Sequence, residues 1–445
     1  MRSRACSGMT SFMNESKIKK SSARSVALDL IAAVLQRKTP LDKALASNLD
    51  IAMLEHRDRN HARAITAMTL RRLGQIDALI DKMLERPLTR KNMGVKNIIR
   101  IGIVQLLFMN TAPHAAVNTS VQLAKNRGYG THKKLINAVL RRISREGKKI
   151  IKNQDEARLN TPDWLWSAWI KAYGEKLCRN IAKAHLLEAP LDITAPLNRA
   201  LWAEKLDANI LSTGTLRRHS GGLVHDLPGF QDGAWWVQDA AAALPVKLLG
   251  NIKNKHVIDL CAAPGGKTAQ LAHAGAKVTA VDRSEKRIEQ LRENMARLKL
   301  DVEFITADAT QWHPENRVYA VLLDAPCSST GTIRRHPDVM QLKRPEEVLK
   351  LVSVQKRLLE AAIKMVQPGG LIVFCLCSLE LEEGPAIARS LKNRPKLIKH
   401  VAITPKEVSG CKEFINDDGD LRTLPCHFSK HGGIDGFFAT RFQKL

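Results

Sequence analysis

Apolar residues recur at helical spacing through the first third of the chain. In the first such segment, Val26, Ala27, Leu30, Ile31 and Val34 follow the 3.6-residue period of an amphipathic helix. Similar apolar stretches, separated by short polar turns, occupy 62–73, 76–84, 95–109 and 135–143. No strand-like alternation of comparable length occurs before residue 150. The pattern therefore predicts an all-helical domain over 21–150, preceded by a flexible tail over 1–20.

The pattern changes towards residue 150. The polar segment 147–160 is predicted to be a linker, and the following Thr-Pro-Asp is typical of a helix start, with Thr161 as N-cap. Trp164, Trp166 and Trp169 come next, and packing into a core is favoured over a base-stacking platform. The stretch from 190 to 233 is mixed in pattern, with Gly-rich turns. We therefore expect a linker and a small α+β connector over 151–237.

From Gln238 onward, short β-rich runs alternate with helical patterns. The β-rich runs are 257–260, 278–281, 302–305, 318–323 and 371–377. The helical patterns between them are 267–274, 285–298 and 345–366. This alternation is typical of a mostly parallel sheet with helices on both faces. The sequence therefore predicts an α/β, Rossmann-like domain over 238–445, in which ligands bind beyond the carboxyl ends of the strands.

The charge of the chain is concentrated at its N-terminal end. The 445 residues include 70 Lys and Arg and 44 Asp and Glu, a formal net charge of +26. Residues 1–150 contain 29 basic and 10 acidic residues, so +19 of this charge lies there. A generally basic, solvated surface is one interpretation, but the regional excess favours contact with nucleic acid. The candidate contacts are Arg141, Arg142 and Arg145, near the end of the last predicted helix.

Several classes of protein are not expected. No apolar run approaches the ~20 residues of a membrane span, and the first twenty residues lack the apolar region of a secretory signal. The eight cysteines are not regularly spaced, and no Cys and His spacing matches a tetrahedral metal site. We therefore expect a cytoplasmic monomer that binds neither a membrane nor a metal.

The residues after the first three predicted strands are typical of a nucleoside-binding site. The first strand leads into the small-residue turn 261–268, but Cys261 occupies the position at which a phosphate-binding P-loop needs Gly. Asp282 ends the second strand, where an acid can accept hydrogen bonds from ribose hydroxyls. Asp308 follows the third strand and is placed to meet an adenine amino group. Together these features predict a cofactor that contains a nucleoside.

Two later strands end in cysteine-containing segments. The fourth is followed by Asp324, Cys327 and a run of small residues. A zinc deaminase would have Pro-Cys-x-x-Cys there, and Thr330 stands in place of the second cysteine. In the fifth strand, Cys375 and Cys377 share a face, because strand side chains alternate. A buried cysteine is usually a small apolar residue, but Cys327 and Cys377 are expected to converge on one pocket.

These segments resemble the RNA cytosine-C5 methyltransferases, and among them the bacterial enzymes that act on 16S ribosomal RNA. The resemblance rests on CAAPGGKT (261–268), VDRS (281–284), ADAT (307–310), DAPCSSTGTIRRHP (324–337), and the PGG and CS within 368–378. The segment 432–442 resembles that family's final hairpin, and 114–125 and 136–143 resemble its NusB-type helical domain. The resemblance covers about residues 21–445.

The resemblance implies a SAM-dependent methyltransferase domain over 238–445 with 16S rRNA as substrate. Cytosine C5 is a poor nucleophile until a thiolate adds to C6. By analogy Cys377 is that thiolate, Asp324 holds the N3/N4 edge of the base, and Cys327 assists the final elimination. The residues implied to hold SAM are Cys261, Ala262, Ala263, Pro264, Gly265, Gly266, Lys267, Asp282, Asp308 and Asp324.

The sequence departs from the family pattern around the nucleophile. Leu376 replaces the usual Thr, Cys375 is an additional thiol, and Gly384 occupies the position of an expected Asn. Cys327 is the rival nucleophile, because DNA cytosine methylases use the cysteine of the Pro-Cys motif. A different class also stays open, a catalytically silent RNA-binding or assembly factor that retains the fold.

Overall fold

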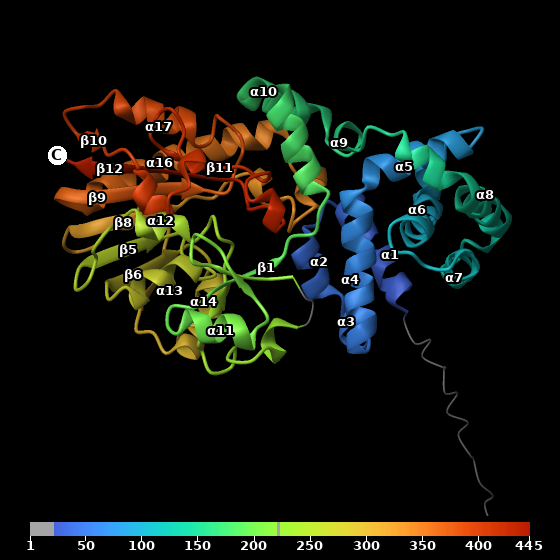
Figure 1. The fold of residues 1–445 in the computed structure, drawn as a ribbon, viewed down its shortest axis with the longest axis horizontal. Helices are drawn as coiled ribbons and strands as arrows, with labels where there is room; N and C mark the ends of the chain where they lie inside the picture. The colour runs from blue at the N-terminus through green and yellow to red at the C-terminus, as the bar shows by residue number, and fades with distance from the viewer. Residues whose placement is uncertain (1–21, 220–222) are drawn as a thin grey trace, which may run out of the picture.

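A computed structural model describes residues 22–219 and 223–445. The tail predicted over 1–20 lies outside the described residues. In Figure 1 the N-terminal helices lie at one end of the molecule and the large sheet at the other, with helix α10 (Asp163–His185) near the junction. Within the described ranges, no helix is both long and apolar enough to cross a membrane.

The N-terminal part of the described chain is helical, as predicted. Its α-helices are α1 (Ala23–Leu35), α2 (Leu41–Ser47), α3 (Leu49–Ala52), α4 (His56–Arg71), α5 (Leu73–Met83), α6 (Met93–Leu107), α7 (Pro113–Asn126) and α8 (Lys133–Lys152). Helix α6 is central to this domain, because its apolar residues are almost all buried and it contacts α1, α4, α5, α7 and α8. The predicted apolar faces therefore meet around α6, and a second, smaller cluster joins α1 to α2, α3 and α4.

Helix α8 is longer than the sequence pattern indicated. It continues to Lys152, because Ile150 and Ile151 extend its apolar stripe and pack against the same core as Ile143. Residues 147–152 of the predicted linker 147–160 therefore belong to α8. Arg141, Arg142 and Arg145 consequently lie in the middle of α8, and the expectation that they lie near its C-terminal end is wrong.

The segment after α8 packs against the C-terminal domain. It contains α9 (Glu156–Leu159) and α10, which begins at Asp163 with Pro162 as its N-cap, so Thr161 is not the cap. Trp166 and Trp169 are buried, in one cluster with Ile333 and Leu379 of the C-terminal domain. The prediction that these tryptophans pack a core is confirmed for this pair.

A small antiparallel sheet with one helix forms the rest of the connector, as the mixed sequence pattern predicted. Its elements are β1 (Leu191–Thr194), α11 (Arg199–Lys205), β2 (Asn209–Ile210), β3 (Leu216–Arg218) and β4 (Trp236–Val237), in the strand order β2-β3-β1-β4. Trp235 is fully buried in its core. The sheet lies against the C-terminal domain, since Arg217 donates to the carbonyl groups of His431 and Gly433.

The C-terminal domain is built on an eight-stranded mixed sheet. Its strands are β5 (His256–Leu260), β6 (Lys277–Asp282), β7 (Glu303–Thr306), β8 (Val318–Asp324), β9 (Val366–Leu376), β10 (Ile398–His400), β11 (Leu421–Thr423) and β12 (Phe437–Lys444). Its α-helices are α12 (Leu244–Lys247), α13 (Gly266–His273), α14 (Glu285–Leu298), α15 (Val339–Leu342), α16 (Pro345–Met365) and α17 (Pro385–Lys392). The strand order is β10-β12-β9-β8-β5-β6-β7, with β11 paired to β12. Strands β5 to β9 are parallel, as predicted, and β12 pairs antiparallel with β9 and with the edge strand β10.

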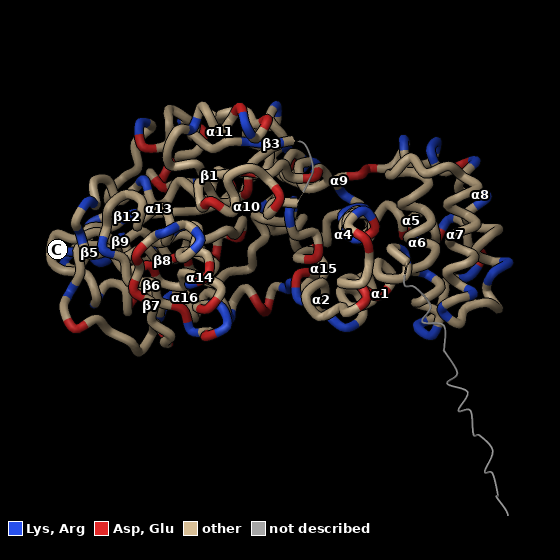
Figure 2. The backbone as a smooth tube through the Cα atoms, turned by 90° about the horizontal axis from the view of Figure 1, so that it is seen from below, with Lys and Arg blue, Asp and Glu red and all other residues tan. Residues whose placement is uncertain are grey.

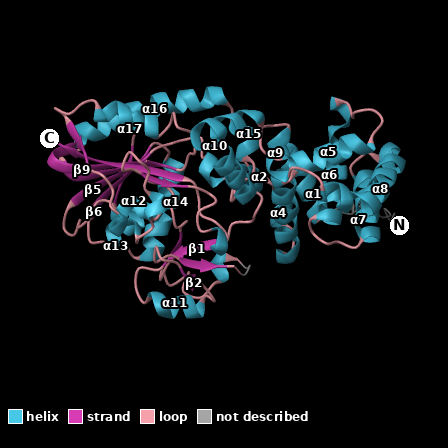
Figure 3. Cartoon of the chain, turned by 45° about the horizontal axis from the view of Figure 1, so that its top comes forward, coloured by secondary structure: helices cyan, strands magenta, loops and turns pink. Residues whose placement is uncertain are grey.

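Helices cover both faces of this sheet. On one face, the strand residues Val257, Leu322 and Cys375 pack with α12, α13 and α14. On the other face, their chain neighbours Ile258 and Leu376 pack with α16 and α17. Figure 3 shows the two helix layers with the sheet between them. The strict alternation of side chains along the strands fixes which residues reach the site.

The helical domain docks on the segment that follows β8. Arg71, which is buried in α4, donates to the backbone carbonyl of Arg334 at 2.9 Å. The backbone N–H of Leu41 donates to the Asp338 carboxylate at 2.9 Å. The N-terminal domain therefore contacts the same chain segment that contains the predicted catalytic Cys327.

Candidate active site

A cavity of about 280 Å³ opens beyond the carboxyl ends of the parallel strands. Each strand supplies a residue to its wall: Cys261 after β5, Asp282 in β6, Asp308 after β7, Asp324 in β8 and Cys377 after β9. Strands β6 and β7 follow β5 on one side of the sheet, and β8 and β9 are added on its other side. Crevices at such reversals are where open α/β sheets bind ligands. The predicted cofactor acids and catalytic residues therefore meet in one cavity.

The turn after β5 is tied to the end of β6. Cys261 and Ala263 line the cavity, and the peptide bond between Ala263 and Pro264 is cis. The backbone N–H of Ala263 donates to Asp282 at 3.3 Å, and the Arg287 guanidinium donates to the Ala263 carbonyl. Arg287 also pairs with Asp282, at 3.1 Å. One cation thus holds both the turn and the strand-end acid.

The two glycines of the turn face a different space. Pro264, Gly265 and Gly266 line a second cavity of about 230 Å³. Gly265 has φ +106°, and a Cβ there would lie 2.3 Å from the Leu291 side chain of α14. The glycine at 265 therefore serves the packing of α14, not the approach of a ligand in the first cavity. Ala262 is buried between the turn and the sheet.

Asp308 is the most exposed of the strand-end acids. Its Oδ1 accepts hydrogen bonds from the backbone and the hydroxyl of Thr310, at 2.9 and 2.7 Å. These bonds lower the pKa of Asp308. The carboxylate is therefore held in place at the cavity rim.

Sequence analysis missed three arginines on this wall. Arg283, Arg287 and Arg357 line the cavity together with the acids. Arg283 lies within the recognised 281–284 motif, before α14, Arg287 lies in the first turn of α14, and Arg357 lies on α16. Spacing from the motif could have suggested the first pair, but only the packing of α16 brings Arg357 here.

Asp324 is paired with Lys267, a residue predicted to touch the cofactor. The Lys267 Nζ lies 2.7 Å from Asp324 Oδ2 and 5.1 Å from the centre of the Phe437 ring. Burial opposes the charged form of Lys267, but the neighbouring Asp324 carboxylate outweighs it and raises the pKa of the amine. One third of the Asp324 side chain remains exposed to the cavity. Lys267 therefore affects the cavity indirectly, by holding the Asp324 carboxylate in place.

The two predicted catalytic cysteines are in contact. Cys327 Sγ lies 3.5 Å from Cys377 Sγ, and both line the cavity. The hydrogen bond with Cys377, burial and the nearby Glu383 raise the pKa of Cys327 well above its ordinary value. Cys327 is thus a neutral thiol near pH 7, able to donate its S–H to a thiolate at Cys377.

Burial also makes two other thiols unreactive. Cys375 is fully buried in β9 with its Sγ 3.8 Å from Asp324 Oδ1, and burial and that carboxylate raise its pKa. Burial, Asp282 and Asp324 raise the pKa of Cys261 to about 12. A thiol attacks as its thiolate, so neither is a good nucleophile near pH 7.

The departures from the family pattern lie outside the cavity. The Leu376 side chain is fully buried on the opposite face of the sheet from Cys375 and Cys377. A Cβ on Gly384 would lie 2.5 Å from the Phe438 ring, so the phenylalanine occupies the space that the expected Asn would need. Both replacements are therefore accommodated by packing against the apolar core.

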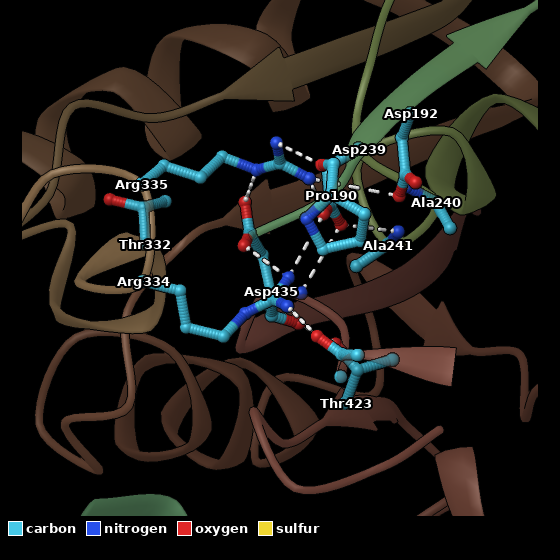
Figure 4. Close-up of polar contacts among 12 residues, drawn as sticks. Pro190, Asp192, Asp239, Ala240, Ala241, Thr332, Arg334, Arg335, Thr423 and Asp435 are labelled. Carbon is cyan, nitrogen blue, oxygen red and sulfur yellow. Dashed lines mark hydrogen bonds and ion pairs between the residues drawn. The ribbon is translucent and has the colours of Figure 1, made fainter. Parts of the chain in front are cut away.

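A buried cluster of charges fixes the far end of the Cys327 segment. Arg334 pairs with Asp435 at 2.9 Å, and Arg335 pairs with Asp239 at 2.6 Å and with Asp435 at 3.1 Å. Figure 4 shows these side chains converging from four segments, which also include Asp192 of β1. Burial opposes ionisation of Asp239, but the two arginines outweigh it and lower its pKa to about 2. The cluster joins the connector, the Cys327 segment and the C-terminal hairpin.

The predicted RNA contacts lie on the surface of α8. Arg141, Arg142 and Arg145 are all exposed, and Arg142 pairs with Glu146 one turn away. In Figure 2 blue segments, which mark Lys and Arg, predominate around α7 and α8. These arginines are distant from the cavity in the chain and belong to another domain. Among the described residues, no group of His, Cys, Asp and Glu is arranged to hold a metal ion.

Comparison with known proteins gives two family matches. Residues 246–443 match the model of the 16S rRNA methyltransferase RsmB/F, and residues 21–145 match the NusB family. Two solved structures share the fold: the protein PH0851, with a TM-score of 0.73 and 21% identity over 95% of this chain and 99% of that one, and a methyltransferase homologue from Pyrococcus horikoshii, with a TM-score of 0.54 and 22% identity over 65% and 98%.

Curated relatives match most of the chain. The ribosomal RNA small subunit methyltransferase B of Shigella sonnei is 33% identical over 388 residues, which cover 82% of this chain and 88% of the relative. The protein of that name from Escherichia coli matches to the same extent. The predicted combination of a NusB-type helical domain and a Rossmann-like methyltransferase domain is confirmed. This chain belongs to the RsmB/F family of RNA methyltransferases.

Proposed function

We propose that this protein transfers a methyl group from SAM to C5 of a cytosine in 16S rRNA, through a covalent bond between Cys377 and C6. The observation that carries the proposal is the pair of thiols, 3.5 Å apart, in a cavity that also contains the strand-end acids. Methylation at an atom that is already nucleophilic would need no thiol. The relatives named rRNA small subunit methyltransferase B support the substrate.

The cavity suits a cofactor that contains a nucleoside. Asp282 and Asp308, at the ends of neighbouring parallel strands, present carboxylates to hydroxyl and amino donors. Cys261 and Ala263, in the turn after β5, also line the cavity. We assign these four residues and Asp324 to SAM. The turn residues Ala262, Pro264, Gly265, Gly266 and Lys267 are proposed to support that wall. When bound, the cofactor supplies the electrophilic methyl group.

The protein's residues have distinct roles in the proposed reaction. Cys377 adds to C6 as a thiolate, and the electron pair of the C5–C6 double bond moves towards C5. Asp324, held by Lys267, binds the N3/N4 edge of the base and stabilises the charge that develops on the ring. After methyl transfer, the C5 proton passes to a water molecule, the C5–C6 double bond re-forms, and Cys377 leaves as a thiolate. The neutral Cys327 thiol assists this elimination by donating its S–H to the departing sulfur.

The helical domain is proposed to help dock the RNA. Exposed Arg141, Arg142 and Arg145 on α8 would contact phosphates. In this proposal the docking domain is 21–150, the connector is 151–237, and the catalytic domain is 238–445. We propose that the protein acts as a monomer in the cytoplasm.

The proposal is tested by methyl transfer to small-subunit rRNA. The full chain is incubated with isotopically labelled SAM and unmodified 16S rRNA, both free and in small subunits, and the nucleosides are separated. Labelled 5-methylcytidine is the expected product. Label in another nucleoside would contradict C5 chemistry. Binding of SAM and RNA without transfer on either substrate would favour a silent assembly factor.

A further inference from the structure

One buried carboxylate joins the two loops that carry the cysteines. Cys327 lies in the loop after β8, and Cys377 lies in the loop after β9. Glu383, which is 0% exposed, accepts a hydrogen bond from the backbone N–H of Ser328 at 2.8 Å and from its hydroxyl. It also accepts a hydrogen bond from the hydroxyl of Ser378. Each serine directly follows one of the two cysteines.

Both oxygens of Glu383 are engaged. Oε1 accepts from Ser328 and from the Gln355 amide at 3.0 Å, and Oε2 accepts from the two serine hydroxyls, which lie 3.0 Å apart. Gln355 belongs to α16 and also donates to the carbonyl of Pro326 at 2.9 Å. Gln355 and both serines are fully buried. Hydrogen bonds to a carboxylate are stronger than those between neutral groups, and burial away from water strengthens them further.

Backbone pairing alone does not hold Cys327. The two loops are joined by Ala325 N–H to the Cys375 carbonyl at 2.9 Å, and by Gly331 N–H to the Cys377 carbonyl at 3.0 Å. Cys327 lies between these two contacts, where the loop has left the sheet. The chain beside Cys327 is therefore restrained by Gln355, which donates to the Pro326 carbonyl, and by Glu383, which also binds the loop of Cys377 through Ser378.

We infer that Glu383 is a positioning residue, which sets the separation of the Cys327 and Cys377 thiols. Its consequence for catalysis rests on the proposed function, because addition and elimination need both thiols at the same base. The separation itself does not depend on the reaction. It can be measured without RNA or cofactor.

The separation is tested by oxidation of the free protein with diamide. Disulfide formation transfers two electrons and two protons from the thiols to the azo group, which becomes a hydrazine. Peptide mapping then gives the rate at which the Cys327–Cys377 disulfide forms. Glu383→Gln places an amide N–H₂ against groups that themselves donate, so we expect this rate to fall about tenfold.

Glu382→Gln is the matched control. Glu382 precedes Glu383 in the same loop, but its side chain is exposed at the surface. The control should form the disulfide at the wild-type rate.

Ser378→Ala removes the hydroxyl that binds Glu383 on the Cys377 side, together with its contacts to Ser328, Thr330 and the Glu380 N–H. The bonds from Ser328 to Glu383 remain, so this variant should give a smaller decrease. The melting temperature shows whether each variant folds. If Glu383→Gln does not fold, the disulfide rate of Ser378→Ala tests the inference in its place.

Activity then separates this inference from the proposed reaction. In Glu383→Gln, kcat for rRNA methylation should fall with little change in KM, and covalent protein–RNA adduct should accumulate. A slower disulfide in the variant, with no RNA methylation by wild type, would support the positioning role and refute the reaction. Wild-type oxidation rates in both folded variants, or no disulfide in wild type, would overturn the positioning role.

Discussion

The two thiols in the cavity are chemically identical but differ in their surroundings. Cys327 is kept protonated by burial, Cys377 and Glu383, so it can donate to its neighbour. We predict that Cys377→Ala loses methyl transfer, whereas Cys327→Ala forms a protein–RNA adduct that survives denaturation. Gel mobility of labelled RNA after denaturation distinguishes the two. Cys178→Ala, at a buried site in α10 outside the cavity, is the control and should turn over normally. Full activity in Cys377→Ala would refute the assignment.

Asp324 is expected to act through its charge. Asp324→Asn keeps the shape but removes the ion pair with Lys267 and the negative charge at the base edge. We predict a fall in kcat of about 100-fold or more and a smaller weakening of SAM binding, because Asp324 is assigned to the cofactor as well as to the base. Steady-state kinetics and calorimetry measure the two effects. Asp301→Asn, at an exposed loop position, should leave both unchanged; a similar loss there, or none in Asp324→Asn, would contradict the role.

At the scale of single residues, the position of a side chain at the end of a predicted strand was enough to predict most of the site. Asp282, Asp308, Asp324, Cys327 and Cys377 were expected together, because each follows a parallel strand, and all five line one cavity. The contact of Arg357 could not be foreseen, since it depends on how α16 crosses the sheet.

The elements that position these residues follow from simple patterns. The β-rich runs predicted the parallel strands, and strand alternation predicted that Cys375 and Cys377 share a face. The prediction that α8 ends near residue 146 was wrong. The segment after Gly147 is mostly polar, but it contains Ile150 and Ile151, which continue the apolar stripe of the helix. The glycines after β5 were assigned to a ligand, but Gly265 is needed for the packing of α14.

Helix α8 carries a prediction of its own. Changing Arg141, Arg142 and Arg145 to Gln removes three exposed positive charges, so rRNA affinity should fall about 10-fold or more and depend less steeply on salt. SAM binding should persist. Filter binding at several salt concentrations measures the change. A matched control changes Lys253, Lys255 and Lys277 to Gln, which are exposed at the opposite edge of the sheet from the cavity. Equal loss in both triple variants would contradict specific docking by α8.

On the scale of the whole molecule, the segment that contains Cys327 contacts both of the other domains of the chain. The segment that follows Cys327 is bound by the helical domain through Arg71 and by the connector and C-terminal hairpin through Arg335. These contacts join residues far apart in the sequence. Hydrophobic periodicity predicts each domain but contains no information on such pairings.

His185 makes the stability of the molecule depend on pH. Its ring is buried beside Trp169, and neither ring nitrogen has a hydrogen-bond partner among the described residues. Burial, Arg334 and Arg71 lower its pKa from 6.5 to about 3. Below pH 6.5 the unfolded chain binds a proton that the folded chain does not. The free energy of unfolding should therefore fall with decreasing pH, by about 2 kcal/mol from pH 7 to pH 5.

The His185→Leu variant tests this dependence. Calorimetric unfolding at pH 7 and pH 5 should show a smaller loss of stability in the variant than in wild type. Only the difference in pH dependence matters, because the substitution also changes packing. An equal loss in both proteins would show that His185 is not the source.

The central claim is that Cys377 bonds to a cytosine of rRNA, and a covalent trap tests it most directly. The protein and SAM are incubated with 16S rRNA that contains 5-fluorocytidine, whose fluorine blocks the final elimination. The attached peptide is identified by mass spectrometry. We predict an adduct on Cys377. An adduct on Cys327 or Cys375, or none although SAM and RNA bind, would contradict the claim.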